Sequence, residues 1–576
     1  MQKKEKNPPK NKQESSKTNQ IDLENSTVHH THQNDLLFLP LGGSNEIGMN
    51  VNLYRYKGKW LMVDLGAGFA HDRHPGCDML APDLSFIKEH KKDLVGIVFT
   101  HAHEDHIGSV GYLYKELGCT IYATPFSAEV AKYKLAENGQ LDKAKIIEIQ
   151  PNSTFNVGPF ELEFIQITHS IPEMNAVVIK TEYGKVLHTG DWKFDPEPVE
   201  GPLTNEKALK ALGKEGALAI VCDSTNVFNP KHSGSEGDLE DSFYRLLKGK
   251  KGMVVVSTFA SNVARMHTIA KIAKKLKRKV VIAGWSMRRI STIAKQTGYL
   301  TNLGDFHSDK ELKHFKRDEV LVLCTGCQGE TRAAMSKIAR GEHPNIKLSK
   351  QDTVVFSSKI IPGNERKIFD LFNKFVHLGC EVVTEKDHKV HVSGHPSREE
   401  LAKMYSMVRP NISIPVHGEP VHLAEHIRFA KEMGVKFAVQ VKNGAMVRIA
   451  PGNPHVIKQV KTGYLAVDGR ILQPDDGEVM TLRRRMRDEG IIFVTIVLDK
   501  QDELIAEPAV AMPGVIDHHI YESFLTSLSN DLAITVDNMS RKDYKKLFDK
   551  CRSVVRKKVE DLTGKTPLIE FQILRV

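Results

Sequence analysis

The sequence predicts a multidomain α/β protein, and three regions of different patterning carry this prediction. The chain of 576 residues is about four times as long as a typical single domain of ~150 residues. Residues 36–223 are rich in short apolar strands, residues 231–380 alternate strands with helices, and residues 481–576 resume a strand-and-helix pattern after a turn-rich stretch. We therefore expect a layered α/β fold with an inserted parallel sheet and a small C-terminal α/β domain.

Composition narrows the class of protein. The chain has 81 Lys and Arg residues, 71 Asp and Glu residues, and 40% hydrophobic residues, which excludes a wholly disordered chain and a membrane bundle. It contains neither an apolar run of transmembrane length nor the apolar core of a signal peptide in residues 1–34, so a cytoplasmic protein is expected. Its seven cysteines are odd in number and scattered, which is typical of a reducing compartment rather than of a disulfide framework.

Residues 1–34 are predicted to be a disordered tail. They contain no Phe, Tyr or Trp and are rich in Lys, Asn, Gln and Ser, so they cannot bury enough surface to offset chain entropy. His29, His30 and His32 belong to this tail, where solvated side chains are the ordinary expectation.

The strand-rich region, residues 35–230, is predicted to form one part of a sandwich. Strands are expected at 36–41, 50–55, 60–64, 95–100, 161–167, 175–180, 185–188 and 218–222, with a helix after His106. Strands at 388–392 and 412–416, with helices at 398–407 and 420–433, are expected to form its second part, residues 381–450.

Residues 231–380 are predicted to form a separate domain with a parallel sheet, because strands and helices alternate. The expected pairs are 252–259 with 262–276, 279–283 with 286–297, 320–324 with 331–340, and 353–357 with 364–377. The turns in 451–480 predict a linker. In the terminal domain, 481–576, strands are expected at 491–499 and 567–575 and helices at 520–530 and 541–562.

A histidine cluster follows the strand at 95–100. The sequence His101-Ala-His103-Glu-Asp105-His106 places three imidazoles and the Asp105 carboxylate within six residues, before Gly108 and a helix. Alternate residues point to different sides, so the cluster can serve two metal ions. His169 and Asp191 each end a strand and are further candidate ligands, whereas His417, before a helix, fits a ligand and a hydrogen-bonded loop histidine equally well.

These residues and several other blocks together resemble a known family. The sequence is similar to the ribonuclease J family, in the β-CASP group of the metallo-β-lactamase fold, over about 36–576. The blocks are Leu41–Asn50, Val63–Gly66, His101–His106, His188–Asp191, Cys222–Asn226, Ser357–Glu365, His391–His395 and Pro415–Glu419. The resemblance implies a metallo-β-lactamase αββα sandwich, an inserted β-CASP parallel α/β domain and a small C-terminal α/β domain.

The resemblance also implies a ligand set for two divalent metal ions, Zn or Mn. One ion would be held by His101, His103 and His169, and the other by Asp105, His106 and His417, with Asp191 shared between them. Asp64 would brace the ligand loop from outside the coordination sphere. His395, Asp105 and Asp223 would be catalytic residues, and His395 and Asp223 match the motifs that define the β-CASP insertion.

The chemistry that this implies is phosphodiester hydrolysis. Two cations lower the pKa of a bridging water and clamp a phosphate for in-line attack, leaving a 5′-phosphate. His395 precedes Ser397-Arg-Glu-Glu400, a capping-box pattern that opens a helix, where anions are favoured. Its imidazole could stabilise the developing phosphate charge or protonate the leaving oxygen, and a histidine that merely caps the loop is the alternative.

Several turns after strands are predicted to contact substrate. The resemblance implies RNA contacts from Ala260, Ser261, Asn262, His391, Val392, Ser393, Gly394 and His395. Ser357 and Ser358, like Thr325 and Gly326, follow strands and could seat a 5′-terminal phosphate. Polar residues at 260–262 are also ordinary helix N-caps. Cys324 and Cys327 have redox or zinc spacing but no second pair, so small turn residues are expected there; family members usually carry Ser where Cys327 stands.

The function that the resemblance implies is 5′-to-3′ exonuclease and endonuclease activity on single-stranded RNA, in rRNA processing and mRNA decay. A homodimer or tetramer through the C-terminal domain, an RNA helicase or ribosome partner, and no membrane are expected with it. The histidine cluster alone would also fit a small-molecule hydrolase such as a thioesterase or lactonase, and a non-catalytic RNA-binding scaffold is the third reading.

The net charge of +10 is unevenly distributed. Residues 231–380 contain 28 Lys and Arg residues against 14 Asp and Glu residues, so the remainder of the chain is net negative. A positive inserted domain beside a two-metal site would attract a polyanion toward its cleavage point.

Overall fold

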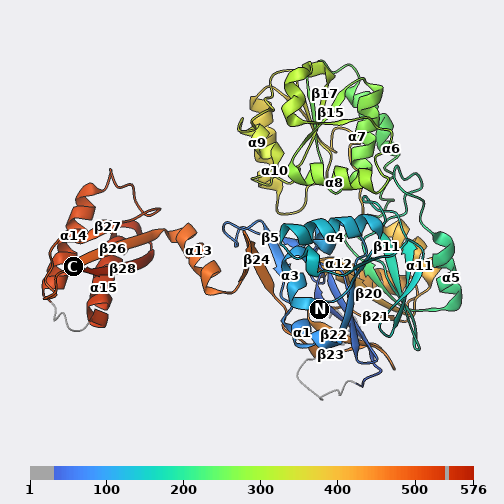
Figure 1. Ribbon diagram of the computed structural model, residues 1–576, viewed down its shortest axis with the longest axis horizontal. Coiled ribbons are helices and arrows are strands. Elements are labelled where there is room, and N and C mark those ends of the chain that lie inside the picture. Colours follow the sequence, from blue (N-terminus) through green and yellow to red (C-terminus); the bar gives the residue numbers. More distant parts are fainter. Residues whose placement is uncertain (1–31, 539–543) are drawn as a thin grey trace, which may run out of the picture. The chain divides into compact units, whose positions relative to one another are not determined.

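The computed structural model describes residues 32–538 and 544–576 (Figure 1). Most of the predicted disordered tail, including His29 and His30, lies outside these residues. Gln33, near the end of that tail, accepts a hydrogen bond through its carbonyl from Gly58 N (2.9 Å). No helix in the described part of the chain is long and apolar enough to span a membrane.

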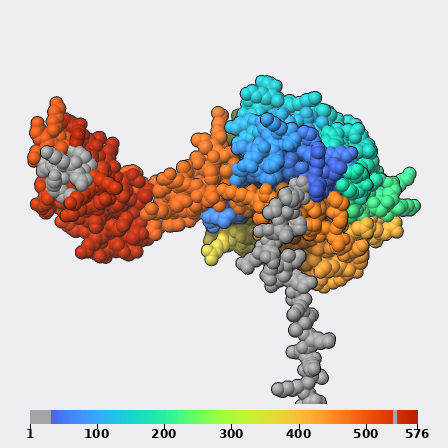
Figure 2. Space-filling model, turned by 90° about the horizontal axis from the view of Figure 1, so that it is seen from below, coloured from blue at the N-terminus to red at the C-terminus, as the bar shows by residue number. Residues whose placement is uncertain are grey.

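Two sheets form the core of the sandwich domain, which is built from the chain before and after the inserted domain. The first sheet, in the order β23-β22-β1-β2-β3-β6-β7-β8, consists of β1 (Leu36–Gly42), β2 (Val51–Tyr56), β3 (Lys59–Val63), β6 (Leu94–Val98), β7 (Ile121–Ala123), β8 (Ile146–Glu148), β22 (Ala445–Ala450) and β23 (His455–Gln459). Strand β1 pairs antiparallel with β22. Early and late segments of the chain, blue and orange, accordingly adjoin on the face shown in Figure 2.

The second sheet packs its apolar face against the first. Its order is β21-β20-β13-β12-β11-β10-β9, with β9 (Thr154–Val157), β10 (Phe160–Gln166), β11 (Asn175–Thr181), β12 (Gly184–His188), β13 (Ala217–Asp223), β20 (Ile412–Val416) and β21 (Phe437–Ala438). Phe38 and Tyr54 of the first sheet share one buried cluster with Phe164, Val177 and Ile414 of the second. This apolar burial, worth about 25 cal/mol per Å², holds the two sheets together.

Helices cover the outer faces of both sheets, which completes the four-layer αββα sandwich. On the first sheet lie α1 (Ser85–Glu89), α2 (Glu104–Ile107), α3 (Val110–Leu117) and α4 (Pro125–Glu137), and on the second α5 (Glu206–Glu215), α11 (Arg398–Val408) and α12 (Pro420–Glu432). The apolar side of α3, with Val110, Leu113 and Leu117, is fully buried against the first sheet. Short 3₁₀ helices cover Lys91–Asp93, Leu141–Lys143, Asp309–His314 and Arg317–Glu319.

The inserted domain leaves the sandwich between two neighbouring strands. Strands β13 and β20 pair in parallel, and the chain between them forms a third, entirely parallel sheet. Its order is β16-β15-β17-β14-β18-β19, with β14 (Val254–Ser257), β15 (Lys279–Ala283), β16 (Phe306–Ser308), β17 (Val320–Cys324), β18 (Thr353–Phe356) and β19 (Glu381–Val383). The parallel sheet predicted from strand–helix alternation is thus confirmed.

Both faces of this parallel sheet are covered, as its nearly continuous apolar strands require. Helices α6 (Asp238–Leu247), α7 (Val263–Lys275) and α8 (Trp285–Gln296) pack on one face, and α9 (Ala334–Ala339) and α10 (Glu365–His377) on the other. Figure 1 shows α7 and α9 on opposite sides of β15 and β17.

The prediction of a strand at 388–392 is wrong, because these residues, all of which the structure describes, form no strand. The carbonyl of Val390 accepts hydrogen bonds from Arg265 Nη1 (3.0 Å) and Ser357 Oγ (2.7 Å). Side chains of the inserted domain therefore take the place of a neighbouring strand. The chain instead forms β19 just before this segment.

The predicted linker, residues 451–480, contains regular structure. Strand β23 belongs to the first sheet, and β24 (Tyr464–Asp468) and β25 (Ile471–Pro474) form a fourth sheet with β4 (Gly68–Phe69) and β5 (Met79–Pro82). Pairing of Ala81 with Leu465 ties the late segment to the early one. Helix α13 (Glu478–Glu489) follows.

The C-terminal part forms a small α/β unit, as predicted. Strand β26 (Ile491–Leu498) lies between β27 (Ala509–Ala511) and the parallel β28 (Leu568–Arg575), with α14 (Glu522–Asp537) and α15 (Tyr544–Thr563) packed against them. Alternate residues of β26, such as Ile492, Val494 and Ile496, are buried under these helices.

Candidate metal centre

The histidine cluster lies where β6 gives way to α2. His101 and His103 lie in the connecting loop, and Asp105 and His106 lie in the first turn of α2. His103 stands at the position before α2 with extended backbone angles. This change from extended to helical backbone directs the four side chains into two groups.

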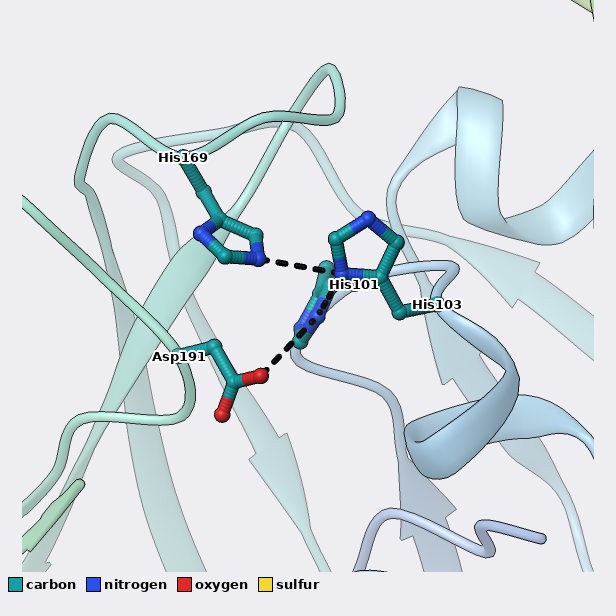
Figure 3. A group of neighbouring side chains, drawn as sticks. All are labelled: His101, His103, His169 and Asp191. Carbon is teal, nitrogen blue, oxygen red and sulfur yellow. Dashed lines mark hydrogen bonds and ion pairs between the residues drawn. The ribbon is translucent and has the colours of Figure 1, made fainter. Parts of the chain in front are cut away.

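The first group consists of His101, His103, His169 and Asp191 (Figure 3). Nδ1 of His103 lies 3.1 Å from Nε2 of His101 and 3.0 Å from Nε2 of His169. Oδ2 of Asp191 lies 3.9 Å from Nε2 of His101. In Figure 3 the three rings and the carboxylate, from three separate segments of the chain, point toward a common centre.

This donor set fits a divalent cation. Tetrahedral nitrogen ligands at zinc-like bond lengths stand about 3.3 Å apart, close to the separations among these imidazoles. Burial lowers the pKa of His103 to about 4 and the pKa values of His101 and His169 well below their usual value, with neighbouring imidazoles adding to the effect. All three rings are therefore neutral at pH 7, which is the state that binds metal.

The second group consists of Asp105, His106, Asp191 and His417. His106 Nε2 lies 3.1 Å from Asp191 Oδ2, and His417 Nδ1 lies 3.0 Å from Asp191 Oδ1. Asp105 Oδ2 lies 3.2 Å from His417 Nε2. Asp191 thus reaches both groups, and the structure brings together all seven residues that the sequence suggested as ligands.

Carboxylates dominate the electrostatics of the second group. Burial opposes the charged form of His106, but Asp191, Asp105 and Asp64 outweigh it and raise the pKa of His106 well above its usual value. Burial likewise opposes charge on Asp105, and His106 together with His417 lowers its pKa to about 2. The carboxylates that favour a proton on His106 would equally favour a divalent cation, which would take the place of that proton.

The position of His417 is set by its backbone. It follows β20 in the left-handed region, with φ +53°, and its N–H donates to Gly43 O (2.5 Å). Gly43 belongs to the loop after β1, where Ser44 and Glu46 form isolated bridges to Gly418. The first glycine-rich block of the sequence therefore supports a ligand that lies more than 370 residues later in the chain.

Hydrogen bonds outside the ligand groups orient the ligand rings. Asp64 Oδ2 lies 2.6 Å from Nδ1 of His106, and its two oxygens also accept from Thr100 N and Thr100 Oγ1, both at 2.8 Å. Nδ1 of His169 lies 2.6 Å from Gly394 O. Each contact places a proton on Nδ1 and leaves Nε2 of the same ring to face the centre.

His395 and Asp223 form a pair beside the two groups. His395 Nδ1 lies 2.8 Å from Asp223 Oδ2 and 3.9 Å from Asp191 Oδ2. Burial opposes charge on His395, but Asp223 and Asp191 prevail and raise its pKa. A quarter of the His395 side chain is exposed, so the ring is charged more readily than a free histidine and remains accessible.

The residues around His395 are arranged partly as expected. Ser397 precedes α11, and its N–H donates to Glu400 Oε2 (2.9 Å), the contact that the capping-box pattern predicts. Ser393 Oγ accepts from His395 N (3.1 Å). Val392 is buried, and Nδ1 of the half-buried His391 has no hydrogen-bond partner within the described residues.

The other predicted substrate contacts lie in the inserted domain. Asn262 caps α7 by accepting from Arg265 N (2.8 Å), while Ala260 and Ser261 lie in the turn before it. Ser357 is buried, and its hydroxyl donates to Val390 O, so this hydroxyl is occupied within the protein. Ser358 is also buried.

Arg265 is a supporting residue that no sequence pattern indicated. Its guanidinium is fully buried, pairs with both oxygens of Glu236 (3.1 and 2.9 Å), and donates to the carbonyls of Ser357 and Val390. These bonds hold the segment leading to His391–His395 against the inserted domain. This role can be recognised only from contacts in the folded structure, because Arg265 lies within an ordinary amphipathic helix.

Glu46 is a second residue whose supporting role no sequence pattern indicated, although it lies in the block Leu41–Asn50. It accepts hydrogen bonds from Gly43 N (3.2 Å), Asn443 Nδ2 (2.5 Å) and Tyr464 OH (3.0 Å). Asn443 Oδ1 in turn accepts from Ser44 N (2.9 Å). The network fixes the loop whose carbonyl at Gly43 holds His417.

The cysteines take no part in the centre. Within the described residues all seven are unpaired, and Cys324 and Cys327 are both buried. Burial raises the pKa of the Cys324 thiol to about 12, so it is inert as a nucleophile at neutral pH.

Fold and centre together define the class of protein: a metallohydrolase of the metallo-β-lactamase fold with a β-CASP insertion. Family models agree along the chain. They match "Metallo-beta-lactamase superfamily" at residues 47–256, "Ribonuclease J, beta-CASP domain" at 251–375, "Zn-dependent metallo-hydrolase RNA specificity domain" at 380–440 and "Ribonuclease J C-terminal domain" at 478–576.

Curated relatives cover nearly the whole chain. Ribonuclease J of Sinorhizobium meliloti is 37% identical over 96% of this chain and 100% of its own length, and ribonuclease J of Corynebacterium glutamicum is 35% identical over 93% and 75%. A solved structure of a protein of unknown function from Enterococcus faecalis V583 covers 72% of this chain and 99% of its own, with a TM-score of 0.49 and 16% identity. The chain belongs to the ribonuclease J family. It is a metal-dependent ribonuclease, which decides against the small-molecule hydrolase and the non-catalytic scaffold.

Proposed function

We propose that this ribonuclease degrades single-stranded RNA from the 5′ end and also cuts it internally, and that it serves rRNA processing and mRNA decay. The observation that carries the hydrolytic part is the sharing of Asp191 between two ligand groups beside the His395–Asp223 pair. The excess of positive charge in residues 231–380 supports a long polyanionic substrate.

Different residues of the chain have different roles in the proposed reaction. Two bound divalent cations would supply an activated water and charge neutralisation at the scissile phosphate. Asp64 and the carbonyl of Gly394 hold His106 and His169 in the tautomer that binds metal. Asp191 reaches both groups and fixes their separation.

His395 is proposed to act on the leaving side of the reaction. Its Nδ1 faces Asp223, so Nε2 is the nitrogen available to substrate. The raised pKa keeps a proton on the ring near neutral pH, and such a ring can stabilise phosphate charge or protonate the departing ribose oxygen. Asp223 orients the ring and stabilises its charge.

Zinc is the metal proposed for the centre. The first group offers three imidazole nitrogens and one carboxylate, a set that suits zinc, whereas the second group, with two carboxylates, also accommodates manganese. Metal analysis of the protein purified without added metal, followed by reconstitution of the metal-free protein with each ion, distinguishes them.

The C-terminal unit is proposed to support a dimer or tetramer. Large apolar side chains are exposed there, including Phe493, Ile505, Ile520 and Ile534. Ile520 is 73% exposed, which is costly for an isolated chain in water. Light scattering of the wild type and of Ile520→Ser with Ile534→Ser tests this, and an unchanged mass would contradict it. A helicase or ribosome partner and a cytoplasmic location stay predictions.

RNA hydrolysis with defined 5′ ends tests the proposed activity. Single-stranded RNAs carrying a 5′-monophosphate, a triphosphate or a hydroxyl are incubated with the metal-loaded protein and with His103→Ala. The wild type is expected to release mononucleotides from the RNA with a 5′-monophosphate. It is also expected to produce internal fragments from the RNAs with a 5′-triphosphate or a 5′-hydroxyl. Absence of mononucleotides would refute the exonuclease, absence of internal fragments would refute the endonuclease, and unchanged turnover by His103→Ala would refute catalysis at this centre.

A further inference from the structure

Trp285 is an exposed aromatic residue at a rigid position in the inserted domain. It is the first residue of α8, and 81% of its surface is accessible. Of the three tryptophans, all within the described residues, Trp60 and Trp192 are almost wholly buried. An indole so exposed loses the stabilisation that burial would give it, so its exposure calls for an explanation beyond folding.

The packing of α8 does not require Trp285. Met287, Ile290, Ile293 and Ala294 supply the buried side of this helix. The residue before it, Gly284, has φ +114°, and a Cβ there would lie 2.6 Å from Thr325 Oγ1. The sharp turn after β15 thus places Trp285 at the start of α8 while its side chain remains outside the core.

The side of α8 that carries Trp285 faces the metal-bearing domain. Arg289 lies one turn further along the helix, on the same side. Its Nη1 pairs with Glu137 Oε2 (2.9 Å) of α4, and its guanidinium lies 4.2 Å from the ring centroid of Tyr133.

Helix α4 connects this contact to the metal centre. Lys134, between Tyr133 and Glu137, donates to both oxygens of Glu104 (2.8 and 2.6 Å). Glu104 immediately precedes Asp105, a residue of the second ligand group. Arg289, one helical turn after Trp285, is thus linked through α4 to the segment that carries the second ligand group.

The edge of the parallel sheet adds an independent sign of a ligand. Trp285 follows the carboxyl end of β15, and ligands of open parallel sheets bind beyond the carboxyl ends of the strands. Thr258, which follows β14 at the same edge, is fully buried, and its hydroxyl has no hydrogen-bond partner among the described residues. A polar ligand at this edge would satisfy that hydroxyl.

We propose that Trp285 is a stacking platform for one unpaired base of the RNA as it passes between the inserted domain and the metal centre. This inference rests on the proposed action on single-stranded RNA. An indole face suits any base, because every base has a π-face, so the contact would hold the strand without selecting a sequence. The positive charge of the surrounding domain would engage the phosphates on either side.

Fluorescence gives a direct test, because Trp285 is the accessible indole. The metal-loaded, full-length protein is titrated with a nuclease-resistant 2′-O-methyl oligonucleotide, and affinity and acrylamide quenching are measured. Trp285→Ala should bind about ten-fold more weakly, in the range found when a stacked aromatic residue is removed. Trp285→Phe should recover most of the affinity. Phe369→Ala, which removes another exposed aromatic residue of the same domain, should bind like the wild type.

Abasic sugars separate stacking from phosphate contacts. Moving one abasic position along the oligonucleotide should, at one location, lower wild-type affinity to that of Trp285→Ala and leave the variant unaffected. Equal affinity of wild type and Trp285→Ala, or an indole that bound oligonucleotide does not shield from acrylamide, would overturn the inference, as would a change of oligomeric mass in Trp285→Ala. If RNA is still cleaved in those cases, only the stacking role falls; if the wild type neither binds nor cleaves single-stranded RNA, the proposed function falls as well.

Discussion

Asp64 and His106 form a buried hydrogen bond of 2.6 Å between carboxylate Oδ2 and ring Nδ1, linking the turn after β3 to the first turn of α2. Asp64 adopts φ +65°, a conformation unusual for a residue with a side chain. It is stabilised there by two hydrogen bonds from Thr100. The local strain is consistent with a site where geometry serves function.

Asp64→Asn is expected to weaken metal binding about 10- to 100-fold, because the ligand ring loses its charged partner. The measurement is competition for zinc with a chelator of known affinity. Asp93→Asn is the matched control, since Asp93 pairs with Lys59 on the surface. Equal zinc affinity in Asp64→Asn and wild type would contradict the orienting role.

Glu46→Gln is expected to reduce occupancy of the second metal position more than the first. Glutamine has one acceptor oxygen in place of two, while Gly43 N, Asn443 and Tyr464 all donate to Glu46. The loop that holds His417 would shift, whereas His101, His103 and His169 lie on other segments. Metal content measured across a chelator titration should show the loss of one ion first. Simultaneous loss of both ions would argue against this local effect.

Stability is expected to fall below pH 6.5 in a manner that depends on His426. Burial lowers the pKa of His426 to about 4, while Ser224 and Tyr405 hydrogen-bond its two nitrogens. The neutral ring contributes stability above the unfolded pKa of about 6.5, and this is lost as pH falls toward 4, by about 2 kcal/mol at pH 5.

Denaturant unfolding between pH 7 and pH 5 tests this expectation. The pH dependence should be smaller by about that amount in His426→Gln than in the wild type. His377→Asn, a change at an exposed histidine, should leave the pH dependence unaltered. An equal fall in stability for His426→Gln and wild type would contradict the assignment.

Arg265→Met is expected to destabilise the protein by about 3–5 kcal/mol, because Glu236 would be left as a buried, unpaired charge. The double variant Arg265→Met with Glu236→Gln should recover part of this loss. Both are measured by denaturant unfolding of the metal-loaded protein. A single variant as stable as the wild type would show that the pair does not hold the segment near Val390.

Much of the architecture could be predicted from sequence because it depends on local patterns. The strands of the sandwich and the strand–helix pairs of the inserted domain follow from periodicity, and the observed bounds mostly differ by only a few residues. The prediction for residues 388–392 failed because their alternation is typical of a strand, while their hydrogen-bond partners are the side chains of Arg265 and Ser357. These partners come from α7 and from the residue after β18, both of which are distant in the sequence.

The ligands were predictable to different degrees. The residues of His101–His106 are close in sequence, so their spacing alone indicated a metal site. His417 was ambiguous alone, because its place depends on a hydrogen bond to Gly43 and on contacts with Asp191. The supporting role of Glu46 could not be predicted, because Asn443 and Tyr464 contact it only in the folded chain.

The central claim is that RNA is hydrolysed at two metal positions that share Asp191, and counting metal ions and measuring RNA turnover on one preparation tests it most directly. The wild type is expected to hold two ions per chain and to lose turnover as chelation removes them, while Asp191→Ala should retain at most one ion and be more than about 100-fold slower. Full turnover by wild-type protein stripped of metal, or by Asp191→Ala, would contradict the account.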